Sequence, residues 1–126
     1  MVIWYKGTVR RGTQDGRTIG FPTVNLDPTV LGKVTKEGVY GSLVKIEDKT
    51  YLGALYFGPR LVKGETTRVL EINIFDFEND IYGVEITFGL LQFIRGVANF
   101  NSMLELKDQI AKDIADIKTL NPDFLT

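Results

Sequence analysis

The sequence contains no cysteine and no histidine. Without cysteine there can be no disulfide, no thiolate nucleophile and no cysteine-ligated zinc site. Without histidine, a Ser–His catalytic triad and histidine-based metal ligation are excluded. A catalytic base must therefore be a carboxylate, a lysine or a tyrosine. A bound metal must be a hard cation held by oxygen atoms, for which Mg²⁺ is the best fit.

Long apolar runs and a strong charge imbalance are also missing. No run approaches the roughly 18–20 apolar residues of a membrane span, and the N-terminus lacks the features of a signal peptide. The formal net charge is −1, with 44% apolar and 25% charged residues, which is typical of a soluble globular protein and not of a dedicated nucleic-acid binder. We expect one cytoplasmic domain over residues 1–126, a monomer that binds neither membrane nor nucleic acid.

Residues that favour β-strands dominate most of the chain. The polar residues 47–49 separate two such runs and predict a hairpin, and residues 78–80 predict a further turn. The predicted strands cover residues 2–9, 39–46, 50–57, 68–77 and 81–95. This pattern predicts a β-meander or a small barrel of five or six strands.

The chain changes period after these strands. Ser102 and Glu105 have the spacing of a capping box, and Asn121–Pro122 supplies a stop. Between them, apolar residues recur at three- and four-residue intervals at Met103, Leu106, Ile110, Ile114, Ile117 and Leu120. We expect an amphipathic C-terminal helix packed against its own barrel, although a partner-docking helix would show the same pattern. The fold class is therefore α+β, and mainly β.

A glycine series occupies the N-terminal part of the chain, at Gly7, Gly12, Gly16 and Gly20. Glycines allow the backbone to approach a polyphosphate closely and to donate its N–H groups to it. The series matches neither a P-loop nor a dinucleotide fingerprint. Glycine-rich stretches are also often plain turns, so both interpretations stay open from the residues alone.

The series ends on Pro22-Thr23-Val24-Asn25. On an extended segment, Thr23 and Asn25 would point to the same side and would offer two neutral oxygens beside phosphates, a suitable seat for Mg²⁺. Arg17 could pair with phosphate oxygens. Arg10 and Arg11 could also collect anions, but short basic clusters are usually ordinary surface, and a Thr-x-Asn pair is often a turn.

Glu71 lies within the strand predicted over residues 68–77, which otherwise alternates well. Leu70 and Ile72 fall on the opposite face. A carboxylate in such a strand is costly to bury unless it is paired or used. Asn73 shares its face, which favours the alternative that this face is simply solvated.

Residues 7–25, GTVRRGTQDGRTIGFPTVN, closely resemble the riboflavin kinase signature G-x-V-x-x-G-x-x-x-G-R-x-x-G-x-P-T-A-N. Further resemblance follows in order, and it covers nearly the whole chain. The similar segments are EGVYG at 37–41, LEINIFDF at 70–77, DIYG at 80–83, FIR at 93–95 and the closing helix at 99–114.

The resemblance implies a six-stranded antiparallel Greek-key barrel with a C-terminal helix. It also implies transfer of the ATP γ-phosphate to the riboflavin 5′-hydroxyl, with Mg²⁺, to give FMN and ADP. In this family Thr23 and Asn25 would hold the metal and phosphates, and Glu71 would accept the hydroxyl proton. Arg95 would lie where the flavin is held. The implied nucleotide contacts are Gly12, Gly16, Arg17, Gly20 and Val24.

Several positions depart from the family pattern. Val24 replaces the usual alanine, and Asn73 stands where histidine is common. The segment YFGPRLVKG at 56–64 lacks the threonine of a G-x-x-P-T segment, and RGVANF at 95–100 has Val97 at the usual glutamate position. The two larger departures lie nearer the flavin side, so they put flavin binding in more doubt than nucleotide binding.

Two other classes of protein fit the same features. One is a non-catalytic flavin- or nucleotide-binding module descended from the kinase, and the other is a structural barrel with incidental glycine turns. Retention of Thr23, Asn25 and Glu71 together argues against a pure binder, which would not need a proton acceptor.

Overall fold

The computed structural model describes residues 2–11, 23–33, 35–59 and 67–120. Six strands and two helical segments lie in these ranges. They are β1 (Trp4–Thr8), β2 (Val24–Leu26), the 3₁₀ helix η1 (Pro28–Leu31), β3 (Gly38–Ile46), β4 (Lys49–Pro59), β5 (Arg68–Ile74), β6 (Glu85–Arg95) and the α-helix α2 (Met103–Lys118).

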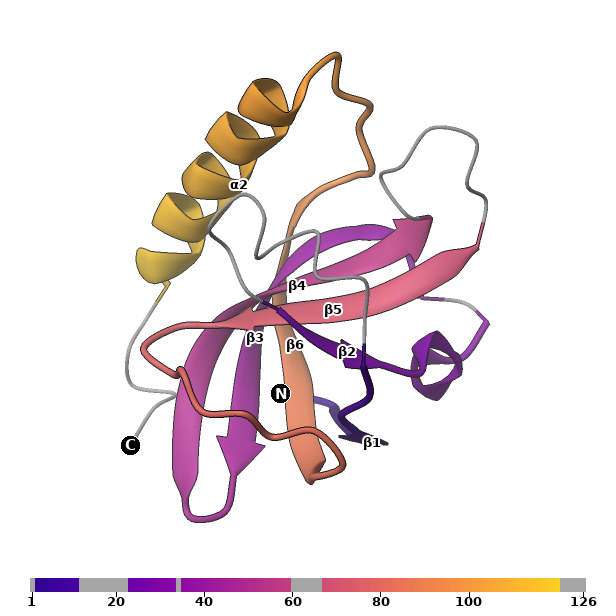
Figure 1. Cartoon of the computed structure of the whole chain (residues 1–126), viewed down its shortest axis with the longest axis vertical. Helices are drawn as coiled ribbons and strands as arrows, with labels where there is room; N and C mark the ends of the chain where they lie inside the picture. The colour runs from indigo at the N-terminus through magenta and orange to yellow at the C-terminus, as the bar shows by residue number, and fades with distance from the viewer. Residues whose placement is uncertain (1, 12–22, 34, 60–66, 121–126) are drawn as a thin grey trace.

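The six strands form one antiparallel sheet in the order β1-β6-β3-β4-β5-β2. Because β6 returns beside β3 after the β3-β4-β5 meander, the sheet contains a Greek key. The sheet curls on itself (Figure 1), and among the described residues its two edges meet at a bridge between Arg10 and Asn25. The mainly β Greek-key fold with one C-terminal helix is confirmed, as a half-barrel.

The predicted hairpin is the β3–β4 pair, whose register is unbroken from Gly38 opposite Phe57 to Ile46 opposite Lys49. The connection is only Glu47-Asp48, because Lys49 belongs to β4. Glu47 adopts a positive φ of 55°, as residues of such tight hairpin loops commonly do.

Strand β5 follows the predicted alternation. Leu70 and Ile72 are fully buried and Ile74 is nearly so, whereas Glu71 and Asn73 are half-buried on the other face. The inner face joins the main core, which also contains Leu55, Phe57 and Phe88. Burial of these apolar side chains supplies the main driving force for the half-barrel.

The start of β6 was predicted wrongly. Residues 81–84 form a turn, and the strand begins at Glu85. The Asp80 carboxylate accepts the Tyr82 backbone N–H at 3.0 Å, and the Val84 N–H donates to the Ile81 carbonyl at 3.0 Å. A local Asx turn thus overrides the β-propensity of Ile81 and Tyr82.

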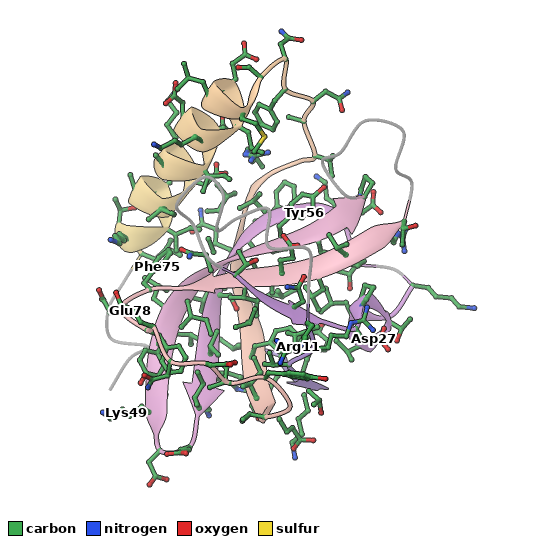
Figure 2. All side chains as sticks on the ribbon, viewed as in Figure 1. Arg11, Asp27, Lys49, Tyr56, Phe75 and Glu78 are labelled. Carbon is green, nitrogen blue, oxygen red and sulfur yellow. The ribbon has the colours of Figure 1, made fainter. Side chains whose placement is uncertain are left out.

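Helix α2 packs on the outer face of the half-barrel (Figure 1), against β3, β4 and β6. A second core lies between them, with Val39, Phe75 and Ile117 buried at its centre. Figure 2 labels Phe75 under the C-terminal end of the helix. The Ser102 hydroxyl accepts the Glu105 N–H at 3.2 Å, which confirms the predicted cap. Asn121 and Pro122 lie outside the described residues.

The Glu105 carboxylate completes the cap differently from the predicted box. It accepts the backbone N–H of Asn101, at 2.8 Å, one residue before the predicted donor. Within the described part of the chain, no helix combines the length and the apolar character that a membrane crossing requires.

Candidate active site

A cavity of about 540 Å³ opens where the two edges of the sheet meet. Its walls come from the end of β1, from β2, from β5 and from the segment between β5 and β6. The lining residues are Val9, Arg10, Arg11, Thr23, Val24, Asn25, Ile72, Ile74, Phe77, Glu78, Asn79, Asp80, Ile81 and Tyr82. The lining combines apolar residues with a few polar and charged ones, as small-molecule sites do.

The cavity lining carries charges of both signs, from Arg10 and Arg11 and from Glu78 and Asp80. The Arg11 guanidinium lies 4.3 Å from the centre of the Tyr82 ring, and Figure 2 labels Arg11 just below β2. The Arg10 N–H donates to the Asn25 carbonyl at 2.8 Å. An aromatic ring beside a guanidinium group suits a ligand with a planar base and anionic groups.

Strand β2 presents its residues to two sides. Val24 packs against the main core from the edge of the cavity, and Asn25 lies directly opposite Glu71 of β5. Asp27 follows the strand and accepts the N–H and the hydroxyl of Thr29 at 2.9 and 2.8 Å. These two hydrogen bonds, with a smaller effect of the Arg10 charge, lower the pKa of the Asp27 carboxyl. The local turn fixes the end of β2 and hence the position of Asn25.

Glu71 lies in the sheet between Asn25 and Tyr56 of β4, the two residues opposite it in the register. Directly opposed residues of antiparallel strands share a face, with Cβ atoms about 4.5–5.5 Å apart. Glu71 is not among the residues that line the cavity, but its neighbour Asn25 is. The half-buried Glu71 therefore has an aromatic residue, Tyr56, on one side and a cavity-lining residue, Asn25, on the other.

Tyr56 has a half-buried ring in the second core, and its hydroxyl donates to the carbonyl of Pro59. Burial, followed by the negative charges of Glu37 and Glu71, raises the pKa of the phenol to about 12, although the Arg95 charge acts in the opposite direction. Tyr56 therefore stays protonated at neutral pH, and its surroundings include both Glu71 and Arg95.

Arg95, at the end of β6, binds Asp113 of α2. Its Nε lies 2.9 Å from Asp113 Oδ1 and its Nη2 lies 2.8 Å from Oδ2. The Asp113 side chain is only 4% exposed and that of Arg95 is 19% exposed. Such a bidentate pair is among the stronger charge-assisted contacts in proteins.

The comparisons with known proteins bear on nearly the whole chain. The family model described as "Flavokinase: Riboflavin kinase" matches residues 2–121. The chain belongs to the riboflavin kinase family.

Two curated relatives and one solved structure place it within this family. The trifunctional protein RibF/MnmA of Mycoplasmoides gallisepticum is 45% identical over 113 residues, which are 88% of this chain and 17% of that protein. The RNA-binding riboflavin kinase RibR of Bacillus subtilis is 41% identical over 110 residues, or 86% of this chain and 47% of that protein. The riboflavin kinase of Trypanosoma brucei superposes with a TM-score of 0.63 and 26% identity, covering 91% of this chain and 76% of that one.

The chain thus spans less than half of the two curated relatives. Of the positions that the family signature marks, Thr23, Val24 and Asn25 line the cavity and Glu71 adjoins it through Asn25. Arg95 lies beside Tyr56, away from the cavity-lining set. Gly12, Gly16, Arg17 and Gly20 lie outside the described residues.

The sequence left three features of this riboflavin kinase family member unassigned. Tyr82 belongs to the DIYG segment at 80–83, and the family resemblance of this segment implies no role for it. Asp113 falls in the apolar stripe of α2 between Ile110 and Ile117, and a carboxylate in that stripe was an available signal. Tyr56 carried no signal, because its place beside Glu71 depends on the pairing of β4 with β5.

Proposed function

We propose that this chain is a riboflavin kinase that transfers the γ-phosphate of ATP to the 5′-hydroxyl of riboflavin. The observation that carries the proposal is the position of Asn25, which lines the cavity together with Arg10 and Arg11 and lies opposite Glu71. A nucleotide in the cavity and an alcohol beside Glu71 would then meet at one point of the sheet.

In the proposed reaction, the riboflavin 5′-oxygen attacks the γ-phosphorus of ATP. The new P–O bond forms as the bond to the ADP oxygen breaks, and Glu71 takes the hydroxyl proton. Phosphoryl transfer depends mainly on position and charge stabilisation, and one carboxylate within reach of the hydroxyl suffices as a general base. Histidine and cysteine are not required for this chemistry.

The donors at the proposed metal site fit Mg²⁺. Thr23 and Asn25 both line the cavity, and no group of three or more acidic residues suited to a metal occurs among the described residues. We propose that these two side chains hold Mg²⁺ together with phosphate oxygens and water, as is usual for this ion. When bound, Mg²⁺ would neutralise charge on the phosphates.

We further propose that Arg10, Arg11 and Tyr82 contact the nucleotide, and that Gly12, Gly16, Arg17 and Gly20 contribute from the family's glycine loop. The described strands share one sheet, which supports a single kinase unit over residues 1–126. The cytoplasm supplies ATP, so we propose that the protein works there, as a monomer without nucleic acid.

The test is FMN formation from riboflavin, ATP and Mg²⁺, measured by chromatography with fluorescence detection. Glu71→Gln should lower turnover by roughly two to four orders of magnitude, because it removes the general base, while riboflavin and ATP still bind. Glu47→Gln is the matched control, since Glu47 lies at the exposed tip of the β3–β4 hairpin and should turn over like the wild type.

Two results would contradict the proposal in different ways. Full activity in Glu71→Gln would remove Glu71 as the base. Tight riboflavin binding by the wild type without any FMN would favour the non-catalytic flavin-binding module.

A further inference from the structure

Each nitrogen of the Arg95 guanidinium donates a hydrogen bond within the protein fold. Nε and Nη2 donate to the two Asp113 carboxylate oxygens, and Nη1 donates to the carbonyl of Gly96 at 3.1 Å. The Gln109 amide, one turn earlier on α2, donates to Asp113 Oδ1 at 3.0 Å. All three guanidinium nitrogens therefore contact protein oxygens, and the carboxylate has its own second partner.

These contacts tie the end of β6 to the middle of α2 and to the segment between them, residues 96–102. The Arg95 guanidinium also lies 5.7 Å from the centre of the Phe100 ring. One side chain thus contacts the start of this segment through Gly96, its later part through Phe100 and the helix through Asp113.

Two glycines let the same segment approach the sheet closely. A Cβ on Gly38 would collide with the carbonyl of Arg95 and would lie 3.1 Å from the Cα of Gly96. A Cβ on Gly58 would lie 3.0 Å from Val97 Cγ2 and 3.1 Å from the Tyr56 hydroxyl. The segment is therefore packed against the ends of β3 and β4, with Val97 next to Gly58 and Tyr56.

Tyr56 connects this packing to the reaction site. It lies opposite Glu71 in the β4–β5 register, and the charges of both Glu71 and Arg95 act on its hydroxyl. Any shift of the segment that carries Val97 would change the surface beside the proposed proton acceptor.

We propose that Arg95 and Asp113 form a positioning pair that holds residues 96–100 beside Tyr56 and Glu71, where the alcohol substrate is received. Arg95 acts from behind this segment and does not itself contact riboflavin. This inference rests on the proposed function and gives Arg95 a different role from the flavin contact that the family resemblance implies.

The first test compares Asp113→Asn with the matched control Asp108→Asn, an exposed aspartate on the same helix. Asp113→Asn should raise the KM for riboflavin by on the order of tenfold to a hundredfold and leave the KM for ATP within about twofold, because small displacements beside a reacting group are costly. Asp108→Asn should leave both constants unchanged. Hydrogen exchange in residues 96–100 should become faster only in Asp113→Asn.

A second test separates positioning from stability. Removing one partner leaves a buried unpaired charge, whereas replacing both partners by apolar residues is often neutral or stabilising. The double variant Arg95→Met/Asp113→Leu should therefore regain the melting temperature that Asp113→Asn loses but keep the raised KM for riboflavin. If the double variant recovered both the melting temperature and the wild-type KM for riboflavin, Arg95 and Asp113 would have only a structural role, and the inference would be overturned.

The two proposals fail in distinguishable ways. A wild-type chain that makes no FMN would refute the proposed function, and this inference would fall with it. An active wild type whose riboflavin KM is unchanged in Asp113→Asn but raised in Arg95→Met would restore Arg95 as a direct contact and overturn the positioning role alone.

Discussion

The ring of Tyr56 is half-buried, and its hydroxyl donates a hydrogen bond to the Pro59 carbonyl. Because burial and the charges of Glu37 and Glu71 raise the pKa of this phenol to about 12, ionisation of Tyr56 is much harder in the folded than in the unfolded chain. At the residue scale, Tyr56 is thus a neutral neighbour of Glu71 and not a second base.

The stability of the fold should reflect this raised pKa at high pH. The contribution of the neutral phenol is complete below the unfolded pKa of about 10 and is lost as the pH rises from about 10 to about 12. Tyr56→Phe, which loses a hydrogen bond worth about 1 kcal/mol and has no phenol to ionise, should be less stable near neutral pH.

The stability gap between wild type and Tyr56→Phe should therefore narrow above about pH 10. Urea unfolding of both proteins at a series of pH values measures this gap. A gap that stays constant through about pH 11 would show that the Tyr56 pKa is not raised.

At the scale of single elements, helix α2 depends on its first turn. Ser102 and Glu105 satisfy backbone N–H groups at the start of the helix, and replacing an N-cap serine by alanine typically costs about 0.5–2 kcal/mol. Ser102→Ala should lower the free energy of unfolding by about 1 kcal/mol, measured by urea denaturation. Ser102→Asp, which keeps an acceptor at the cap, is the control and should remain close to wild type; equal losses in both variants would argue against the cap.

These elements also show which structural features can be predicted from local sequence patterns. The β3–β4 hairpin, the alternation of β5 and the Ser102 cap were predictable, because each depends on residues close together in the chain. The start of β6 was not, because the Asp80–Tyr82 turn competes with β-forming side chains. The role of Asp113 was not predictable, because its partner Arg95 lies on another element and the helix pattern alone does not indicate this pairing.

At the scale of the whole molecule, the candidate site depends on strand order. The predicted Thr23, Asn25 and Glu71 become neighbours only because β2 pairs with β5, and the cavity forms only where β2 meets the end of β1. No local pattern in the sequence specifies these strand pairings. The family resemblance indicates which residues form the candidate site, and the fold shows which of them lie next to one another.

The closure of the half-barrel should respond to nucleotide. In the described residues a single bridge, with the Arg10 N–H donating to Asn25, joins the two sheet edges beside the cavity. Few hydrogen bonds protect such a junction, so amide exchange near Arg10 should be faster than in the centre of β3. Mg–ADP should slow it, since a ligand stabilises the closed form that binds it. Hydrogen exchange with mass spectrometry measures both effects. If Mg–ADP protected only the opposite end of the sheet, the nucleotide would bind there and not in the cavity beside Arg10.

Strand β5 carries core residues and the proposed base in strict alternation, Leu70 and Ile72 inward and Glu71 outward. Loss or gain of one residue within this strand would reverse every side chain beyond it, turning a carboxylate into the core and a core residue outward. Related genes should therefore tolerate many substitutions on β5 but almost no change of its length. Among natural variants of this chain, single-codon insertions and deletions in β5 are expected to be far rarer than at the hairpin tip.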